Sequence, residues 1–412
     1  MKNFIAHTDE VRNEMLKSIS YSSKEDLFKQ LPIKFEDFKM ENPLSELETQ
    51  KRIKSLARKN GTEYANFMGG GVYNKFIPAG VNYLAQRMEF LTAYTPYQPE
   101  ISQGTLQIIY EYQTMISRLT GMDIANASMY DGGSACAEAV LMAHRIARGK
   151  RNKCLVSNRL NPEYKEVVKT YCWAQDIPVV FFDELPADLS EYCCVLVQNP
   201  DYFGELTEIK KPDTILIVCA NLSALSVIEP PREADIVVGD IQPLGISMNF
   251  GGPHAGYMAC KEAYMRQMPG RLVGATVDAD GKTAYTLTIQ TREQHIKREK
   301  ATSNICSNQS LIALSATLYL SLMGEKGFRE TGLISASLAH KLSKMLEQKG
   351  IKTINKNFFN EFVIEVDNSD KVLVKLRQAN ILGGIKLDNK KILVCTTEMN
   401  TEEELQDYVN AL

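Results

Sequence analysis

The chain has 412 residues, a formal net charge of −3 and apolar side chains at 44% of its positions. These values are typical of a soluble globular protein of two or three domains. A charge so close to zero gives no support for a nucleic-acid or membrane partner, and no apolar run approaches the ~20 residues that cross a bilayer. The start, "MKNFIAHTDEVRNEM", is too polar for a secretory signal and too acidic for a transit peptide. We therefore expect a cytoplasmic protein.

The first sixty residues predict helices joined by short loops. Thr8 caps the helical stretch "TDEVRNEMLKSI", and Ser45 and Glu48 form the S-x-x-E pattern of a capping box before "LETQKRIKSLARKN". Pro32 interrupts the segment between these helices. This segment has too few apolar residues to bury a hydrophobic core of its own. Residues 1–63 are therefore predicted to form an arm that packs on the main domain or on a partner.

Residues 64–320 predict a large α/β domain. Glycine-rich or polar loops precede three helices, which begin near Pro78, at "LQIIYEYQTMISRLTG" and at "SACAEAVLMAHRIARGK". Five continuous apolar runs then follow, with helical or polar stretches between them: "KCLVS", "IPVVFF", "CCVLVQN", "TILIVCA" and "ADIVVGD". Continuous runs indicate strands covered on both faces, and hence a mostly parallel sheet between helices.

Residues 321–412 predict a small α+β domain. Its strands are "IKTI", "EFVIEV" and "KILVCTT", and its helices are "LISASLAHKLSKMLEQKG", "SDKVLVKLRQAN" and "TEEELQDYVNAL".

None of the nine cysteines forms a CxxC pair, and several lie inside apolar runs. Free cysteine packs as a small hydrophobic residue, so we interpret the cysteines as reduced core residues. The spacing of metal ligands is absent, which argues against a zinc site. Cys306 would be a nucleophile only with a base beside it, and the sequence places none there.

Three loops are candidates for a ligand site, because ligands of such sheets bind beyond the carboxyl ends of the strands. Gly132, Gly133 and Ser134 open a helix, which suits either a phosphate site or a plain capped turn. Asn199 follows a strand, although an ordinary Asn-Pro turn is the favoured interpretation. His254 is a ring-stacking or acid–base candidate, although a lone histidine is more often structural.

The segment "AYTPYQPEISQG" is unusually rich in amphipathic groups. Tyr94, Tyr97, Gln98 and Ser102 lie close together on it, and two prolines stiffen its path. Aromatic rings with polar tips suit a binding surface, so these residues are predicted to line one.

Five stretches together resemble one family: "YTPYQPEISQG", "YDGGSACAEA", "ADIVVGDIQPLG", "NFGGPHAGY" and "TREQHIKREKATSNIC". The family is glycine dehydrogenase (decarboxylating), the P-protein of the glycine cleavage system. The resemblance is strongest to its N-terminal half, which many bacteria encode as a separate subunit 1. It extends from the "LFKQLPIKF" region to about residue 330, and more weakly to the end. The combination is specific, whereas no single stretch would be.

The resemblance implies a fold, a reaction and partners. The family has the aspartate aminotransferase-like fold (fold type I) of pyridoxal phosphate (PLP) enzymes, with two homologous halves paired as a dimer. It implies an oxidoreductase of glycine catabolism: glycine forms an aldimine with PLP, loses CO₂, and passes its aminomethyl group to the lipoyl group of the H-protein. The implied partners are therefore subunit 2, lipoylated H-protein and glycine.

The resemblance also implies that this chain lacks the lysine that holds PLP. In subunit 2 the corresponding segment reads H-K-T-F before a P-H-G run. Aligning Phe250 and Pro253-His254 with that pattern places Met248 at the lysine, and a thioether forms no Schiff base. PLP is therefore expected to be bound mainly by subunit 2, with none attached covalently to this chain.

Further positions depart from the pattern of PLP enzymes. Val218 or Asn221 stands where an aspartate would contact the pyridine nitrogen. Asn161 stands where this half of the family has histidine. The glycine loops that remain would serve folding and pairing, and Gly132, Gly133, Ser134, Asn199 and His254 are at most weak or vestigial cofactor contacts.

We interpret the chain as the alpha subunit of a heteromeric glycine decarboxylase, inactive alone. Tyr94, Tyr97 and Gln98 are predicted to line a site shared with subunit 2, with Gly69 to Gly71 nearby. One alternative is a non-catalytic partner that stabilises subunit 2 and docks H-protein. Another is a self-sufficient PLP enzyme that uses a lysine of "HIKREK", which lies well past the expected strand end.

Overall fold

The computed structural model describes residues 6–32, 40–61, 63–91, 93–249, 252–290, 294–305 and 308–412. Phe250 and Cys306, which the sequence singled out, lie outside these ranges. The chain divides into two compact units, Met1–Thr62 and Glu63–Leu412. Among the described residues, no helix is long and apolar enough to span a bilayer.

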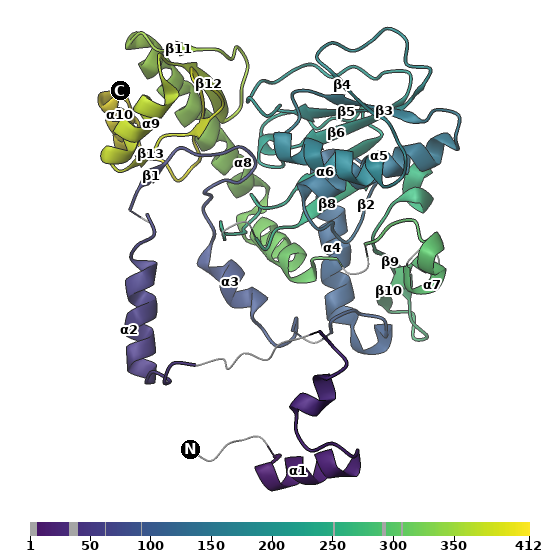
Figure 1. Ribbon diagram of the computed structural model, residues 1–412. Helices are drawn as coiled ribbons and strands as arrows, with labels where there is room; N and C mark the ends of the chain where they lie inside the picture. The colour runs from purple at the N-terminus through teal and green to yellow at the C-terminus, as the bar shows by residue number, and fades with distance from the viewer. Residues whose placement is uncertain are drawn as a thin grey trace. The chain divides into compact units, whose positions relative to one another are not determined.

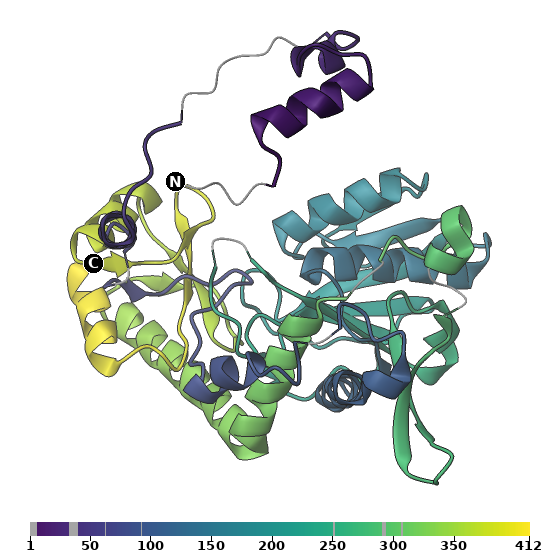
Figure 2. The ribbon, with the colours of Figure 1, turned by 90° about the horizontal axis from the view of Figure 1, so that it is seen from below.

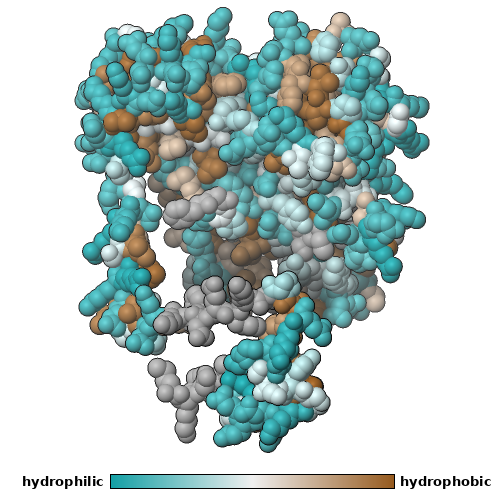
Figure 3. All heavy atoms as spheres, viewed as in Figure 1, coloured by the Kyte–Doolittle hydropathy of each residue, from teal (hydrophilic) through white to brown (hydrophobic). Residues whose placement is uncertain are grey.

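The first unit holds α1 (Asp9–Ser18), η1 (Glu25–Phe28) and α2 (Glu46–Ala57). Both predicted caps are confirmed: Thr8 Oγ1 accepts from the Val11 N–H at 3.4 Å, and Ser45 and Glu48 form the reciprocal capping box. Many apolar side chains of this unit stay exposed, and Figure 3 shows brown side chains along α2. They are Val11, Met15, Ile19, Leu27, Phe28, Leu31, Met40, Leu44, Leu47, Ile53 and Leu56.

The large sheet has seven strands in the order β2-β8-β7-β6-β5-β3-β4. Their bounds are β2 (Ile124–Ala125), β3 (Lys153–Ser157), β4 (Val179–Phe182), β5 (Tyr192–Asn199), β6 (Ile215–Ala220), β7 (Ile236–Asp240) and β8 (Gly256–Cys260). Strands β3 to β7 are parallel, whereas β8 runs antiparallel to β7, and β2 antiparallel to β8. The five predicted apolar runs are the five parallel strands, so the mostly parallel sheet is confirmed.

Helices cover both faces of this sheet, as the continuous apolar runs predicted (Figure 1). On one face, Ile217 and Cys219 pack with α5 (Gly132–Ala147) and α6 (Pro162–Trp173). On the other face, Leu216 and Val218 pack with the helices α3 (Ala79–Ala85), α4 (Gln103–Thr120) and α8 (Ser310–Gln348). Neighbouring residues of one strand therefore enter two different cores.

A hairpin beside α4 was not predicted. Its strands are β9 (Leu272–Val277) and β10 (Thr283–Thr288), which pair antiparallel. Figure 2 shows the hairpin projecting from the body next to α4, which is seen almost end-on. Short helical turns complete this unit: η2 (Pro99–Ile101), η3 (Ala224–Ser226), η4 (Glu262–Gln267), α7 (Gln294–Lys297) and η6 (Arg298–Lys300).

The C-terminal part forms a four-stranded antiparallel sheet of order β11-β12-β15-β14. It comprises β11 (Lys352–Thr353), β12 (Glu361–Glu365), β14 (Ile385–Lys386) and β15 (Lys391–Cys395), with helices α9 (Ser369–Gln378) and α10 (Glu402–Ala411). Strand β1 (Ala65–Asn66) pairs with β13 (Ile381–Leu382), so the chain just after residue 63 joins this part. Helix α8 runs continuously through residues 320 and 321 and changes direction at Gly324, where φ is 63°.

Candidate functional site at the carboxyl edge of the sheet

Asp240, the last residue of β7, lies beside the first turn of α5. Its Oδ2 accepts a hydrogen bond from the Gly132 N–H at 3.2 Å, and His254 Nδ1 lies 3.6 Å from the same oxygen. The Asp240 carboxylate raises the pKa of His254, although burial opposes this shift. The structure thus brings together two of the loops that the sequence singled out.

The first turn of α5 is capped by its own side chains. Asp131 Oδ1 accepts from the Ser134 N–H at 2.7 Å, and Ser134 Oγ accepts from the Asp131 N–H at 3.1 Å. A Cβ at Gly132 would collide with the Tyr164 hydroxyl, so the ring of Tyr164 lies directly over this turn. The turn that resembles a phosphate site therefore carries two carboxylates, those of Asp131 and Asp240, and a tyrosine.

The cavity at this edge is small. Its volume is about 40 Å³, whereas sites for small ligands and cofactors usually hold about 300–1,000 Å³. Burial holds the pKa of Tyr73 and of Tyr164 well above the usual value, so both phenols are neutral. The residues that line the cavity are Gly71, Tyr73, Asn161, Tyr164, Gln198, Cys219, Ala220, Asn221, Gly239, Asp240 and Pro243.

These residues do not fit PLP. The phosphate would meet the Asp131 and Asp240 carboxylates instead of free N–H groups, because those N–H groups already donate to the protein. The pyridine ring would require several times the volume present. Met248, at the position expected for the lysine, lies in the loop after β7 with 44% of its surface exposed.

Three asparagines that the sequence singled out form hydrogen bonds within the protein. Asn161 caps α6 and donates through Nδ2 to the Gly70 carbonyl at 3.1 Å. Asn199 closes a turn, since its amide both donates to and accepts from the Thr207 backbone at 3.1 Å. Asn221 Oδ1 accepts from a backbone N–H two residues on, and Val218 is buried in β6. Neither Val218 nor Asn221 supplies the carboxylate that would contact the pyridine nitrogen of PLP.

Tyr97 lies against two cationic or titratable groups on other elements. Its ring centroid is 5.5 Å from the Arg271 guanidinium carbon and 5.5 Å from the His295 ring. Its hydroxyl accepts from Arg271 Nη2 at 3.4 Å. The structure therefore joins the tyrosine loop to the charged segment that carries His295, a pairing that the sequence analysis did not make.

The other residues of this loop divide into exposed and structural ones. Tyr94 is 87% exposed, and Gln98 is also exposed at the start of η2. Ser102 is buried at the start of α4, with 4% of its surface exposed. Gln103 holds the loop in place, because its amide bonds the Pro99 carbonyl and both backbone groups of Tyr285.

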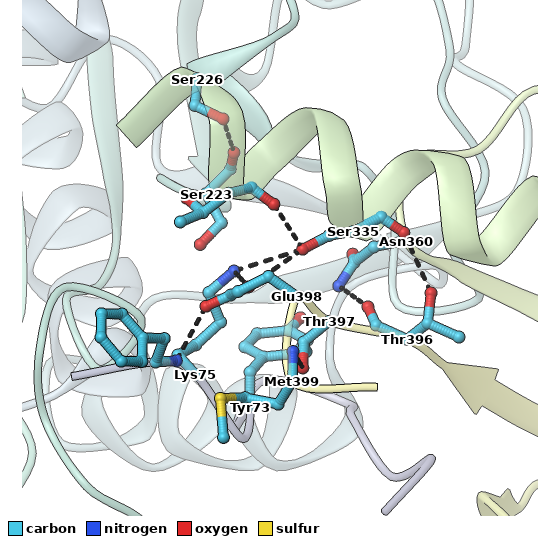
Figure 4. A network of polar contacts seen from close by, with 12 residues as sticks. Tyr73, Lys75, Ser223, Ser226, Ser335, Asn360, Thr396, Thr397, Glu398 and Met399 are labelled. Atoms are coloured by element: carbon cyan, nitrogen blue, oxygen red, sulfur yellow. Dashed lines mark hydrogen bonds and ion pairs between the residues drawn. The ribbon is translucent and has the colours of Figure 1, made fainter. Parts of the chain in front are cut away.

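A buried polar network, missed in the sequence, fixes the segment that follows β1 (Figure 4). Lys75 Nζ lies 2.5 Å from Glu398 Oε2, and Ser335 Oγ donates to the same oxygen at 3.1 Å. Glu398 Oε1 accepts from the Phe76 N–H at 2.8 Å. Lys75 is thus a buried lysine engaged with a carboxylate, and it is not placed to form an imine.

The same segment is held by a second carboxylate and by a side-chain amide that follows β7. Glu361 accepts from the Gly70 N–H at 2.6 Å and from the Tyr73 hydroxyl at 2.8 Å. Gln242, two residues past Asp240, exchanges two hydrogen bonds with the Tyr73 backbone, both at 2.9 Å. Gly70 and Gly71, expected near the tyrosine loop, contact Glu361 and Asn161.

Replacing Glu361 by glutamine is expected to change how stability depends on pH. Burial raises the pKa of Glu361 from 4.5 to about 7, against the hydrogen bonds from Gly70 and Tyr73, so the folded chain binds this proton more firmly than the unfolded chain. Its stabilising contribution is therefore complete below pH ~4.5 and is lost as the pH rises through ~7. Relative to wild type, Glu361→Gln should gain up to about 3 kcal/mol between pH ~5 and pH ~8.

Urea unfolding at several pH values measures this gain. The exposed Glu347→Gln on α8 is the matched control, which should follow the wild-type profile. Parallel profiles for Glu361→Gln and wild type would contradict the assignment.

The thiols and carboxylates build no metal site in the described ranges. Eight cysteines there are buried and form no disulfide, as interpreted from the sequence. No group of three or more His, Cys, Asp or Glu side chains among those residues could hold a metal ion.

Comparison with known proteins agrees with the resemblance found in the sequence. The family described as "Glycine cleavage system P-protein" matches residues 2–412. The chain is 44% identical over 444 residues to a probable glycine dehydrogenase (decarboxylating) subunit 1 of Geobacillus thermodenitrificans, covering 100% of this chain and 99% of the relative. It is 45% identical over 447 residues to the protein so named in Carboxydothermus hydrogenoformans, covering 99% of each chain.

Solved structures confirm the expected fold. A crystal structure of glycine decarboxylase (P-protein) of the glycine cleavage system, in inhibitor-bound form, matches with a TM-score of 0.89 and 40% identity over 99% of each chain. A glutamate decarboxylase of Lactobacillus brevis matches at 13% identity and a TM-score of 0.66, covering 95% of each chain. A C-DES mutant with glycine covalently linked to the PLP cofactor matches at 14% identity and a TM-score of 0.58, covering 85% of this chain and 96% of that one. Similarity at these lower identities shows the shared fold alone, that of PLP enzymes of fold type I. The chain belongs to the glycine cleavage system P-protein family.

Proposed function

We propose that this chain is subunit 1 of a two-subunit glycine decarboxylase. With subunit 2 it decarboxylates glycine and passes the aminomethyl group to the lipoyl group of the H-protein. The observation that carries the proposal is the end-to-end similarity to proteins named subunit 1, at 44% identity over 100% of this chain. The eight cysteines in the described ranges are buried, and buried reduced cysteines suit the reducing cytoplasm as its place of action.

PLP, in this proposal, is held by subunit 2. Three features of this chain support the assignment: Met248 in place of a lysine, the Asp240 carboxylate on the Gly132 N–H, and a cavity of about 40 Å³. When bound, PLP would supply an electron sink for the electron pair that stays on the glycine α-carbon as CO₂ leaves. This chain supplies protein groups at the edge of the partner's site.

Exposed apolar side chains support a partner surface on the Glu63–Leu412 unit. They gather on α3, on the loop after it and on the start of α8, and large exposed patches of this kind mark interaction sites. The most exposed are Tyr83 at 70%, Met88 at 76%, Tyr94 at 87%, Ile101 at 77% and Leu311 at 52%.

Tyr97 is our candidate for a group that reaches the partner's site. Arg271 stacks under the ring and donates to the phenol oxygen, which fixes the direction of the hydroxyl. With its oxygen engaged as an acceptor, the hydroxyl can donate its own hydrogen to an oxygen of the substrate. Gln98, exposed on the next position, would add an amide that donates and accepts.

The alternatives differ in what this chain contributes. A self-sufficient PLP enzyme would need Lys297 or Lys300 as its imine lysine, but both are exposed in α7 and η6, and neither lines the cavity at Asp240. A non-catalytic partner that only stabilises subunit 2 is the stronger alternative, because this chain's own cavity is closed.

Borohydride reduction is expected to leave this chain without a stoichiometrically modified lysine. The chain is incubated with PLP alone and with subunit 2, reduced, and digested for peptide mapping. Modification of a lysine should appear in subunit 2 and not here. Stoichiometric modification of one lysine of this chain would overturn the proposal.

Exchange of the glycine carboxyl group with labelled bicarbonate separates the proposal from the stronger alternative. The chain alone should show no exchange, and the mixture with subunit 2 and H-protein should show it. Equal exchange by subunit 2 and H-protein without this chain would favour a purely stabilising role.

A further inference from the structure

A second cavity lies beside the β2 edge of the sheet, apart from the Asp240 corner. It has a volume of about 710 Å³ and sits between α4, the β9–β10 hairpin and the β2 edge of the sheet. It shares no lining residue with the 40 Å³ cavity. Its volume is in the range of sites for small organic molecules.

The walls of this cavity are fixed by hydrogen bonds. The Gln113 side chain on α4 donates to the Val273 carbonyl at 3.0 Å and accepts from the Val273 N–H at 2.9 Å, which ties the helix to β9. Asp123 accepts from the Glu262 N–H at 2.9 Å, which ties the loop before β2 to η4. The cavity is therefore formed in the free chain.

Two arginines flank one end of this cavity. Arg118 lies in the last turn of α4, and Arg232 packs across Gly121, which ends the helix with φ 69°. A Cβ at Gly121 would lie 3.1 Å from Arg232 Cγ and 3.4 Å from Nη1, so the guanidinium lies close against the helix end. This position needs glycine both for its left-handed backbone and for the approach of Arg232.

Neither guanidinium has an ion pair within the part of the chain that the structure describes. The one carboxylate that lines the cavity, Asp123, already accepts a backbone hydrogen bond. The rest of the lining joins hydroxyl groups, such as Ser117 and Thr288, to apolar groups, such as Met122 and Leu272. Both arginine side chains are exposed, and the lining carries two positive charges against one negative charge, together with an apolar part.

We propose that this cavity binds a small organic acid, with one carboxylate or phosphate group held between Arg118 and Arg232 and an apolar body along Met122 and Leu272. Arginine suits this task because its planar guanidinium donates two parallel hydrogen bonds to such a group. The inference does not rest on the proposed function, because it uses only this cavity and its lining.

Hexanoate is the probe for this site. Isothermal titration of the full chain, at constant ionic strength, should show saturable binding of one hexanoate per chain. Hexanamide, which has the same body without the charge, should bind at least about tenfold more weakly. Arg118→Gln and Arg232→Gln should each weaken hexanoate binding at least about tenfold. Arg377→Gln, an exposed helical arginine of the small domain, should leave it unchanged.

Four outcomes would overturn the proposal. Hexanoate could show no saturable binding, or inorganic phosphate and hexanoate could bind no better than chloride. The Arg377→Gln variant could lose as much affinity as the two cavity variants, which would indicate general charge and no site. Binding could vanish in the complex with subunit 2, which would assign the arginines to an acidic group of the partner.

Discussion

Replacement of Lys75 by methionine is expected to lower the free energy of unfolding of the Glu63–Leu412 unit by about 3–5 kcal/mol. Lys75 and Glu398 lie 2.5 Å apart, with 2% and 5% of their side chains exposed. Methionine keeps most of the volume but leaves a carboxylate buried without its counter-ion. Only the Phe76 N–H and the Ser335 hydroxyl would remain as its donors. Urea unfolding measures the loss.

Two further variants test whether the cost comes from the unpaired charge. Lys352→Met removes an exposed pair with Glu365, whose side chains are 72% and 42% exposed, and should change stability far less. The double variant Lys75→Met with Glu398→Leu removes both charges and should recover most of the loss, since apolar residues often replace a buried pair at little cost. Equal effects of Lys75→Met and Lys352→Met would show that the buried pair does not stabilise the fold.

The segment that contains Lys75 shows why part of this architecture escapes the sequence. Nothing near Lys75 in the chain marks it as buried, and its carboxylate partner is 323 residues away. Glu361 is likewise 291 residues from Gly70. Each pair joins residues hundreds of positions apart in the chain, so no local pattern of charge or polarity encodes it. The parallel strands were predictable because burial on both faces leaves a local signature of continuous apolar residues.

The β9–β10 hairpin had a local signal that the sequence analysis did not use. The stretch "LVGATVDADGKTAYTLT" places polar turn residues between two β-rich runs, which favours a hairpin. In the structure, Asp278 Oδ1 accepts from the Asp280 and Lys282 N–H groups, and Gly281 takes φ 78°. The hairpin forms one wall of the cavity beside Arg118 and Arg232, and it carries Val273, the partner of Gln113.

The amino-acid composition of a loop does not by itself distinguish residues that could bind a ligand from residues that only stabilise a turn. Ser102 and Asn199 are polar loop residues like Tyr97, yet one is buried at a helix start and the other closes a turn. Hydroxyl and amide groups satisfy the backbone and bind ligands with the same chemistry, so spacing alone does not distinguish the two uses. The interpretation of Met248 stays a prediction, and it rests on the one requirement of an imine, an amine, that no other group replaces.

Changing Tyr97 to phenylalanine, or Gln98 to alanine, is expected to lower the exchange of glycine carboxyl with bicarbonate by on the order of 10² in the heteromer. Tyr97→Phe keeps the ring against Arg271 and His295 and removes only the hydroxyl that Arg271 orients. Gln98 is exposed and has no role in the fold that the structure shows, so its truncation should not disturb folding. A loss of rate would therefore report on contact with the partner's site.

Assembly and chemistry must be measured on the same samples. Size-exclusion chromatography should show the heteromer intact for both variants, and the rate of exchange should fall only where the altered group meets the substrate. Tyr83→Phe, which removes a hydroxyl from a side chain 70% exposed on α3, is the matched control and should react at the wild-type rate. If Tyr97→Phe and Gln98→Ala both assemble and react like the control, the loop is structural. The hypothesis that Tyr97 and Gln98 reach the partner's site would then be wrong.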